Sequence, residues 1–163
     1  MTVPTRSVAP ALLQIDAILS RLTGRQALAE ACRFLRQSFA HYPWVGIYRV
    51  DGGELVLDAW DGEKATEHTR IPIARGICGQ AARENRTVIV GDVRTDPNYL
   101  ACFLETQAEI VVPIHHEGSV VGEIDIDGNV VNAFDVSDRR FLESVAERLG
   151  PAVERSGAQL PLG

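Results

Sequence analysis

Two of the chain's three cysteines stand where a thiol could react. Cys78 lies between two glycines at the expected start of a short helix, where outward N–H groups and the helix dipole would lower the pKa of a thiol below about 8.5. Cys102 ends a loop rich in turn-forming residues. Each could instead be a small buried residue. If both face one pocket, they could form a reversible disulfide.

Carboxylates are the second reactive group. Strand alternation in GEIDID places Glu123, Asp125 and Asp127 on one face, and Glu109 opens the neighbouring strand of the same hairpin. Clustered carboxylates repel one another, so we expect at least one to have a raised pKa and to act as a general acid. The remaining anions would attract a cation such as an α-ammonium group. The alternative is a solvated acidic face.

Trp44 and Tyr48 have the same strand parity, so both can lie on one face and wall a small pocket, or they are ordinary packing residues. The sequence contains no CxxC or HxxxH pattern, and we expect no metal. Together, the thiols, acids and aromatic residues suit a small zwitterion that carries a thiol-reducible group.

Composition excludes several classes of partner. The 163 residues carry a net charge of −6 and no basic cluster, which argues against nucleic acid and against an anionic membrane surface. No apolar stretch approaches the roughly 20 residues that span a bilayer. The N-terminal apolar segment is broken by Gln14 and Asp16, unlike a signal peptide. We therefore expect a cytoplasmic protein, whose three cysteines are too few for a disulfide scaffold.

The elements that would position these groups follow from hydrophobic periodicity and turn signals. Cys32 lies on the apolar stripe of the second helix and is expected in the core. We predict helices at about 10–22, 24–42, 77–84 and 136–156, strands at about 44–50, 54–60, 69–74, 87–91 and 109–128 (a hairpin), and a long loop over 92–107.

Helices at both ends and hairpins between them predict an α+β fold. A central, mainly antiparallel sheet would carry the N- and C-terminal helices on one face and the ligand pocket on the other, roofed by the long loop and the short helix. We expect a single domain over residues 10–156, a flexible N-terminal tail over 1–9 and a C-terminal tail over 157–163.

Several motifs, in order along the chain, resemble the free methionine-(R)-sulfoxide reductases, which are single-domain members of the GAF fold. They are WVGIY, RIPIARGICGQA, NYLAC, AEIVVPI, GEIDIDG and FDVSDRRFLE. The resemblance implies reduction of the R-sulfoxide of the free amino acid, with no bound cofactor. It also implies a homodimer formed through the terminal helices.

The resemblance assigns roles residue by residue. It implies that a thiolate attacks the sulfoxide sulfur, that a carboxylic acid protonates the oxygen, and that the resulting sulfenic acid condenses to a disulfide that thioredoxin reduces. The family favours Cys102 as the attacking thiol and Cys78 as the resolving thiol, whereas the helix-start argument favours Cys78 as the attacker. The implied substrate-binding residues are Trp44, Tyr48, Glu109, Asp125 and Asp127.

The sequence departs from the family pattern at two positions. His68 stands where well-known members carry a third cysteine, so recycling must use Cys78 with Cys102 or an external thiol. Gly128 stands where the family tends to have serine. The missing third cysteine leaves an alternative function open, a non-catalytic GAF module that binds a small ligand or senses redox state.

Overall fold

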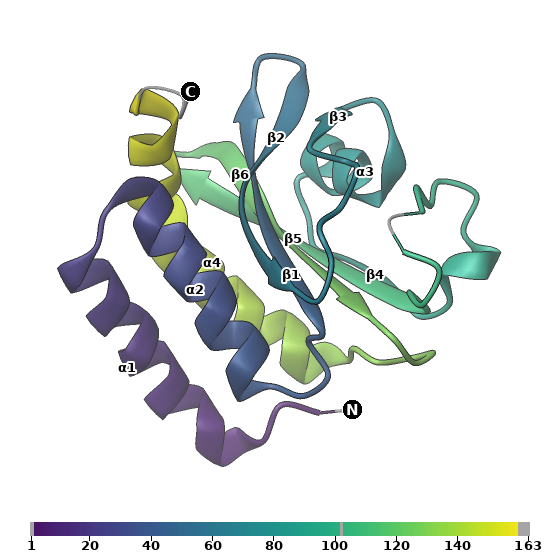
Figure 1. Cartoon of the computed structure of the whole chain (residues 1–163), viewed down its shortest axis with the longest axis horizontal. Coiled ribbons are helices and arrows are strands. Elements are labelled where there is room, and N and C mark those ends of the chain that lie inside the picture. The colour runs from purple at the N-terminus through teal and green to yellow at the C-terminus, as the bar shows by residue number, and fades with distance from the viewer. Residues whose placement is uncertain (1, 102, 160–163) are drawn as a thin grey trace.

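The fold, seen in a computed structural model, is described for residues 2–101 and 103–159 (Figure 1). Helices and strands follow one another in the order that the sequence predicts, with a 3₁₀ turn in the long loop. In chain order the elements are α1 (Thr5–Arg21), α2 (Gly24–Ser38), β1 (Trp44–Asp51), β2 (Glu54–Gly62), β3 (Arg70–Pro72), α3 (Gly76–Glu84), β4 (Val88–Val90), η1 (Val93–Thr95), β5 (Ala108–His116), β6 (Ser119–Gly128) and α4 (Val136–Ala158).

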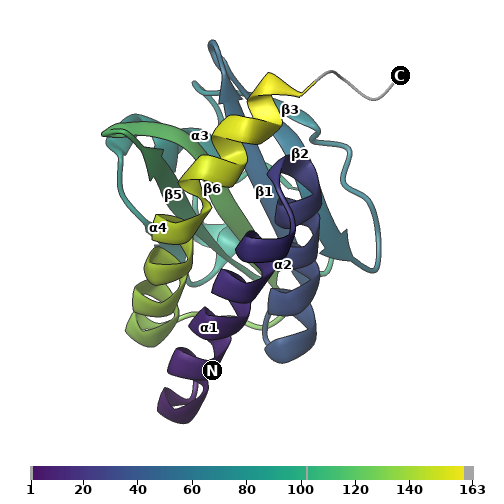
Figure 2. The ribbon, with the colours of Figure 1, turned by 90° about the vertical axis from the view of Figure 1, so that its left-hand side faces the viewer.

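In the described residues the strands form one sheet in the order β3-β2-β1-β6-β5-β4, and each neighbouring pair is antiparallel. Helices α1, α2 and α4 cover one face of this sheet, and α3 lies with the long loop on the opposite side (Figures 1 and 2). The predicted α+β fold, with terminal helices on one face, is confirmed.

Alternation along the central strands divides the interior into two clusters. Ile124 and Ile126 face the helices and share a core with Cys32, whose side chain is fully buried, as predicted. Tyr48 and Cys78 belong to a second cluster on the opposite face, between the sheet and α3. The residues predicted to do chemistry therefore lie against the smaller of the two cores.

The N-terminal segment is more ordered than the sequence suggests. Helix α1 begins at Thr5, inside the segment that we expected to be a tail, and Val3 before it is buried. The Val3 N–H donates a hydrogen bond of 3.2 Å to Oγ of Ser137, at the start of α4. Contact with α4 thus orders residues that have little helical pattern of their own.

Helix α4 contains Pro151 and continues through Ala158, two residues beyond its predicted end. Residues 157 and 158 of the expected C-terminal tail are therefore helical, and residues 160–163 lie outside the described part of the chain. Its N-terminus is closed by a capping box, in which Asp135 accepts from the Asp138 N–H and Asp138 accepts from the Asp135 N–H.

A buried hydrogen-bonded group fixes the start of β1. Asp138 is fully buried and accepts a hydrogen bond of 2.6 Å from the Tyr42 hydroxyl, and its oxygen also lies 2.6 Å from Nε2 of His41. These contacts tie the α2–β1 connection to α4, two residues before Trp44. Among the residues that the structure describes, no helix is both long enough and apolar enough to cross a membrane.

Candidate active site

The register of the central strands brings the predicted acids to one place. On the β1–β6 pair, Trp44 lies opposite Asp127 and Tyr48 opposite Glu123. On the β5–β6 pair, Glu109 lies opposite Asp127. Because side chains alternate along a strand, Asp125 shares this face. The acids and aromatic residues named from sequence therefore form one row across three strands.

This row is not a solvated acidic face. Glu109, Glu123, Asp125 and Asp127 are 4%, 0%, 1% and 3% exposed, respectively. Within the described part of the chain, the carboxyl oxygens of Glu123, Asp125 and Asp127 meet no donor with hydrogen-bonding geometry. Such burial is costly for a charged carboxylate unless it binds a proton or a cation.

Burial therefore raises the pKa of Asp125, and it raises the pKa values of Glu123 and Asp127 well above their ordinary range. The negative charge of Asp125 adds to the rise in the pKa of both neighbours. Contacts with Glu109 lower the pKa values of Asp125 and Asp127, but by less than burial raises them. Burial thus favours the protonated form of these carboxyls, which is the form that a general acid requires.

Cys78 faces this row from the first turn of α3. The turn before it needs Gly76, whose φ of +72° lies in the left-handed region. Gly79 packs closely on the carbonyl oxygen of Ile73, so α3 sits tightly against the chain that leaves β3. The Cys78 side chain is 4% exposed, and its thiol is in range of Glu123 without the geometry of a full hydrogen bond.

This environment corrects our expectation of a lowered thiol pKa. Burial raises the pKa of Cys78 well above its ordinary value, and the charges of Asp125, Glu123 and Glu109 raise it further. The favourable field of a helix N-terminus is worth about 0.3–1 kcal/mol, which is small beside the cost of ionising a buried thiol among acids. Cys78 is therefore a protonated thiol in the resting site.

The sulfur of Cys78 and carboxyl oxygens of Glu109 and Asp125 lie within 4.8 Å of one another, so these residues could together hold a metal ion. Thiolate and carboxylate ligands would suit a cation such as Zn²⁺. Our expectation of a site without metal stays a prediction.

The two aromatic residues are bound to the loop between β2 and β3. The Trp44 indole N–H donates to the carbonyl oxygen of Lys64 at 3.1 Å, and the Tyr48 hydroxyl donates to that of His68 at 2.8 Å. The Trp44 ring also stacks on Trp60, with 6.3 Å between centroids, and contacts Phe103 at 5.8 Å. Both side chains thus pack on the acidic face and hold a loop there.

Hollows lie on either side of the acid row. One of about 150 Å³ opens to solvent and is bordered by Trp44, Phe103 and Asp127. Another, of only about 10 Å³, is bordered by Cys78 and Asp125, together with Leu100 from the long loop. The row therefore connects an open, aromatic-lined end with an enclosed end at the thiol.

Known proteins similar to this chain were found by sequence and by structure. A model of the GAF domain family matches residues 23–154. The Escherichia coli protein named free methionine-R-sulfoxide reductase is 30% identical over 122 residues, which are 75% of this chain and 73% of that protein. The chain belongs to the free methionine-R-sulfoxide reductase family. It is built, like its relatives, on a GAF domain.

Solved structures of the family agree with this assignment. The type II free methionine-R-sulfoxide reductase of Thermoplasma acidophilum is 42% identical, with a TM-score of 0.77 over 80% of this chain and 92% of that one. The free methionine-R-sulfoxide reductase of Neisseria meningitidis, solved in complex with its substrate, is 34% identical, with a TM-score of 0.84 over 98% of both chains.

Cys102 lies outside the described residues, but its neighbours contact the site. The Ala101 carbonyl oxygen is 2.8 Å from Nε2 of His68, and Phe103 contacts Trp44. Leu100 approaches Gly76, where an added Cβ would lie 3.3 Å from it. The long loop thus comes to the reductase-family site on both sides of the cysteine.

The departure at Gly128 has a local explanation. A Cβ at this position would lie 2.9 Å from Cβ of Ala133 and 3.0 Å from the ring of Phe134, so serine would require these neighbours to shift. Sequence reasoning placed Glu123 on the correct face but omitted it from the site, although it is fully buried beside Cys78. The sequence does indicate that Glu123 belongs to the site, because it lies two residues before Asp125 and therefore on the same face of the strand.

Proposed function

We propose that the chain reduces free L-methionine (R)-sulfoxide to methionine by cysteine thiol chemistry. The observation that carries the proposal is the row of buried acids, with pKa values raised by burial, that faces Cys78 beside Trp44. A sulfoxide oxygen leaves from sulfur only when it is protonated, and a buried carboxylic acid with a raised pKa supplies a proton at neutral pH.

In the proposed reaction, the attacking thiolate forms a bond to the sulfoxide sulfur while an acid of the row protonates the oxygen. The protonated oxygen then moves to the cysteine sulfur as the sulfur–oxygen bond of the substrate breaks. The bond between the two sulfurs breaks with its electron pair going to the substrate sulfur, so methionine leaves and the cysteine remains as a sulfenic acid. A second thiol displaces water from the sulfenic acid and forms a disulfide. The substrate sulfur gains two electrons, and the two cysteines lose two.

The site favours Cys78 as the resolving thiol and Cys102 as the attacking thiol. A resting thiol whose pKa is raised by burial and by Asp125 is a poor nucleophile, since the thiolate is the reactive form. Once an acid has given its proton to the substrate oxygen, its carboxylate becomes a base close to the Cys78 sulfur. Protonation of the oxygen therefore prepares the site for the second step.

The open hollow suits the amino-acid end of the substrate. Its border contains Asp127 and the Trp44 indole, which would hold the α-ammonium group and the side-chain methylenes. Glu109 and Asp125 lie along the row toward Cys78 and would polarise the sulfoxide oxygen. Tyr48, by holding the loop at His68, completes the wall.

The disulfide needs an external dithiol, and we propose cytoplasmic thioredoxin for this role because no third cysteine outside the core remains to relay electrons. We also propose a homodimer, with pairing through the terminal helices that cover the outer face of the sheet. Both proposals concern partners that act outside the pocket, so the reaction within it can be tested with dithiothreitol alone.

The test is an epimer-resolved assay of free methionine sulfoxide with the reduced protein at pH 6 to 8. We expect the wild type to consume the R epimer with dithiothreitol or thioredoxin. Cys78→Ser should release about one methionine per chain and then stop with thioredoxin, whereas Cys102→Ser should release none. Absence of turnover with dithiothreitol across this range, with ligand binding kept in the Cys78→Ser/Cys102→Ser variant, would indicate a binding module instead.

A further inference from the structure

His68 joins two loops that lie over the acid row. Its backbone carbonyl accepts the hydrogen bond from the buried Tyr48 hydroxyl, and its backbone N–H donates to Oγ1 of Thr66 at 3.0 Å. Its ring Nε2 lies 2.8 Å from the carbonyl oxygen of Ala101. Because a carbonyl oxygen only accepts, Nε2 carries the proton and donates. The residue thus connects the sheet, the β2–β3 loop and the long loop.

The β2–β3 loop is a firm base for this connection. Trp44 and Tyr48, both buried in the central strand β1, hold its backbone at Lys64 and His68. Hydrogen bonds from rigid, buried side chains fix a loop far better than exposed contacts do. The imidazole of His68 extends this support to the residue before Cys102.

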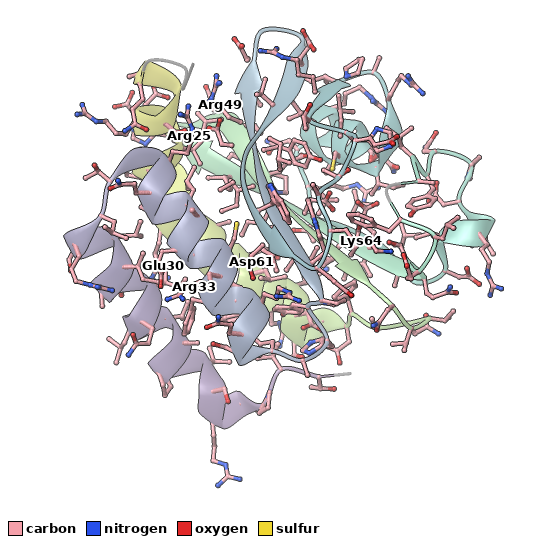
Figure 3. All side chains as sticks on the ribbon, viewed as in Figure 1. Arg25, Glu30, Arg33, Arg49, Asp61 and Lys64 are labelled. Carbon is pink, nitrogen blue, oxygen red and sulfur yellow. The ribbon has the colours of Figure 1, made fainter. Side chains whose placement is uncertain are left out.

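A second link between the loops is weaker. Nζ of Lys64 lies 2.9 Å from a carboxylate oxygen of Glu105, but the two side chains are 61% and 62% exposed. Lys64 extends from the side of the sheet opposite α1 and α2 (Figure 3). Exposed pairs of this kind contribute about 0–1 kcal/mol. Of these two contacts, the His68 hydrogen bond to Ala101 is therefore the one that fixes the long loop directionally.

We propose that His68 is a positioning residue that holds the long loop over the acid row through its hydrogen bond to the Ala101 carbonyl. This inference rests on the proposed function, because it assigns His68 a part in the first chemical step. His68 takes no electrons and no oxygen from the substrate. Its part is to hold the peptide that precedes the attacking residue against a loop anchored on the sheet.

A competing role for His68 is proton transfer. The imidazole is close enough to Asp125 for a charge on the ring to lower the pKa of that carboxyl. Glutamine separates the two roles, since its amide can donate a hydrogen bond from nearly the same place as Nε2 but cannot carry a titratable proton.

The experiment measures the single-turnover rate of methionine formation with reduced protein in excess over the R epimer. We expect His68→Ala to lower the rate constant at saturation about 10- to 100-fold, which is the effect of misplacing a reacting group by about 1 Å. His68→Gln should restore it to within about threefold of wild type. If the alanine variant does not fold, His68→Asn replaces it, since its shorter amide cannot reach Ala101.

His115→Ala is the matched control. Nε2 of His115 lies 2.6 Å from Oδ1 of Asn85, so this variant also removes one histidine hydrogen bond between two segments, but away from the acid row. We expect its rate constant to stay within about twofold of wild type. A general loss of stability would lower the rate in both histidine variants alike.

Three results would overturn the proposal. His68→Ala could retain the wild-type rate, His68→Gln could lose as much activity as His68→Ala, or the loss could lie wholly in KM with kcat unchanged. A retained rate in His68→Ala would show that the contact has no role in the reaction. An equal loss in His68→Gln would indicate proton transfer, and a loss in KM alone would indicate substrate binding. An inactive wild type would instead refute the proposed function itself, so failure of that function can be told apart from failure of the proposal for His68.

Discussion

The buried acid row should make the protein less stable as pH rises from 5 to 8. In the unfolded chain Asp and Glu ionise with pKa values near 4. In the folded chain burial raises the pKa values of Glu123, Asp125 and Asp127, so the folded state binds more protons than the unfolded state above pH 4. Stability that is complete below pH 4 is therefore lost as pH rises toward the folded pKa values.

Each proton that the folded row retains costs about 1.4 kcal/mol of unfolding free energy per pH unit. One retained proton lowers stability by about 2.7 kcal/mol between pH 5 and pH 7, and two retained protons lower it by twice that amount. Single domains have only about 5–15 kcal/mol in total, so this change is large.

Asp125→Asn tests the origin of this slope. An amide cannot ionise, so the variant should gain stability relative to the wild type by about 1.4 kcal/mol per pH unit if Asp125 holds one proton. Losing the Asp125 charge also lowers the pKa values of Glu123 and Asp127, which flattens the slope further. The variant should be inactive as a reductase, so stability and activity change in opposite directions.

The measurement is urea unfolding of the reduced protein at pH 5, 6, 7 and 8. The lower limit avoids Asp135, whose pKa is lowered to about 2 by hydrogen bonds led by that of Ser137 and whose contribution to stability is lost in acid. Asp51→Asn, at the exposed β1–β2 turn, is the control and should keep the wild-type slope. Equal slopes in wild type and Asp125→Asn would refute the argument that buried, protonated acids fill the site.

Other substitutions test the surroundings of the site. Gly79→Ala should cost about 1–3 kcal/mol in urea unfolding, because its Cβ would overlap the carbonyl oxygen of the residue after β3; Gly53→Ala, with open space around it, should change little. Phe103→Ala should raise KM about two- to tenfold with little change in kcat, since it removes one aromatic neighbour of Trp44. Cys32→Ala should keep multiple turnover with thioredoxin, and a loss of recycling there would refute the two-cysteine disulfide.

Local patterns were sufficient to predict the sheet and the composition of the acid row. Alternation in GEIDID separates isoleucines from acids in any strand, and the turns at Gly52 and Gly118 fix which strands pair. The antiparallel order of the central strands then brings Glu109 to Asp127. The alternation does not predict how deeply the acids are buried, because their burial depends on α3 and the long loop.

The N-terminal segment also shows that local patterns do not reveal burial against distant parts of the chain. Val3 and Thr5 carry no strong helical pattern, yet α1 includes Thr5 and Val3 is buried because α4 offers a surface for them. A residue's own neighbours in sequence do not reveal that surface. Likewise, the role of His68 as a link to Ala101 could not be read from a motif, since it depends on two loops meeting.

The pKa of Cys78 is the most instructive error. The field at the start of the helix is worth only about 0.3–1 kcal/mol, and the thiol also faces carboxyl groups across the site. The sequence did contain the necessary facts, since Glu123 and Asp125 were already placed on the pocket face and Cys78 on the helix above it. Acids that face a buried thiol oppose its ionisation and outweigh one helix terminus. In a site of this kind, the acid row should therefore decide the protonation of the thiol, and the helix terminus should not.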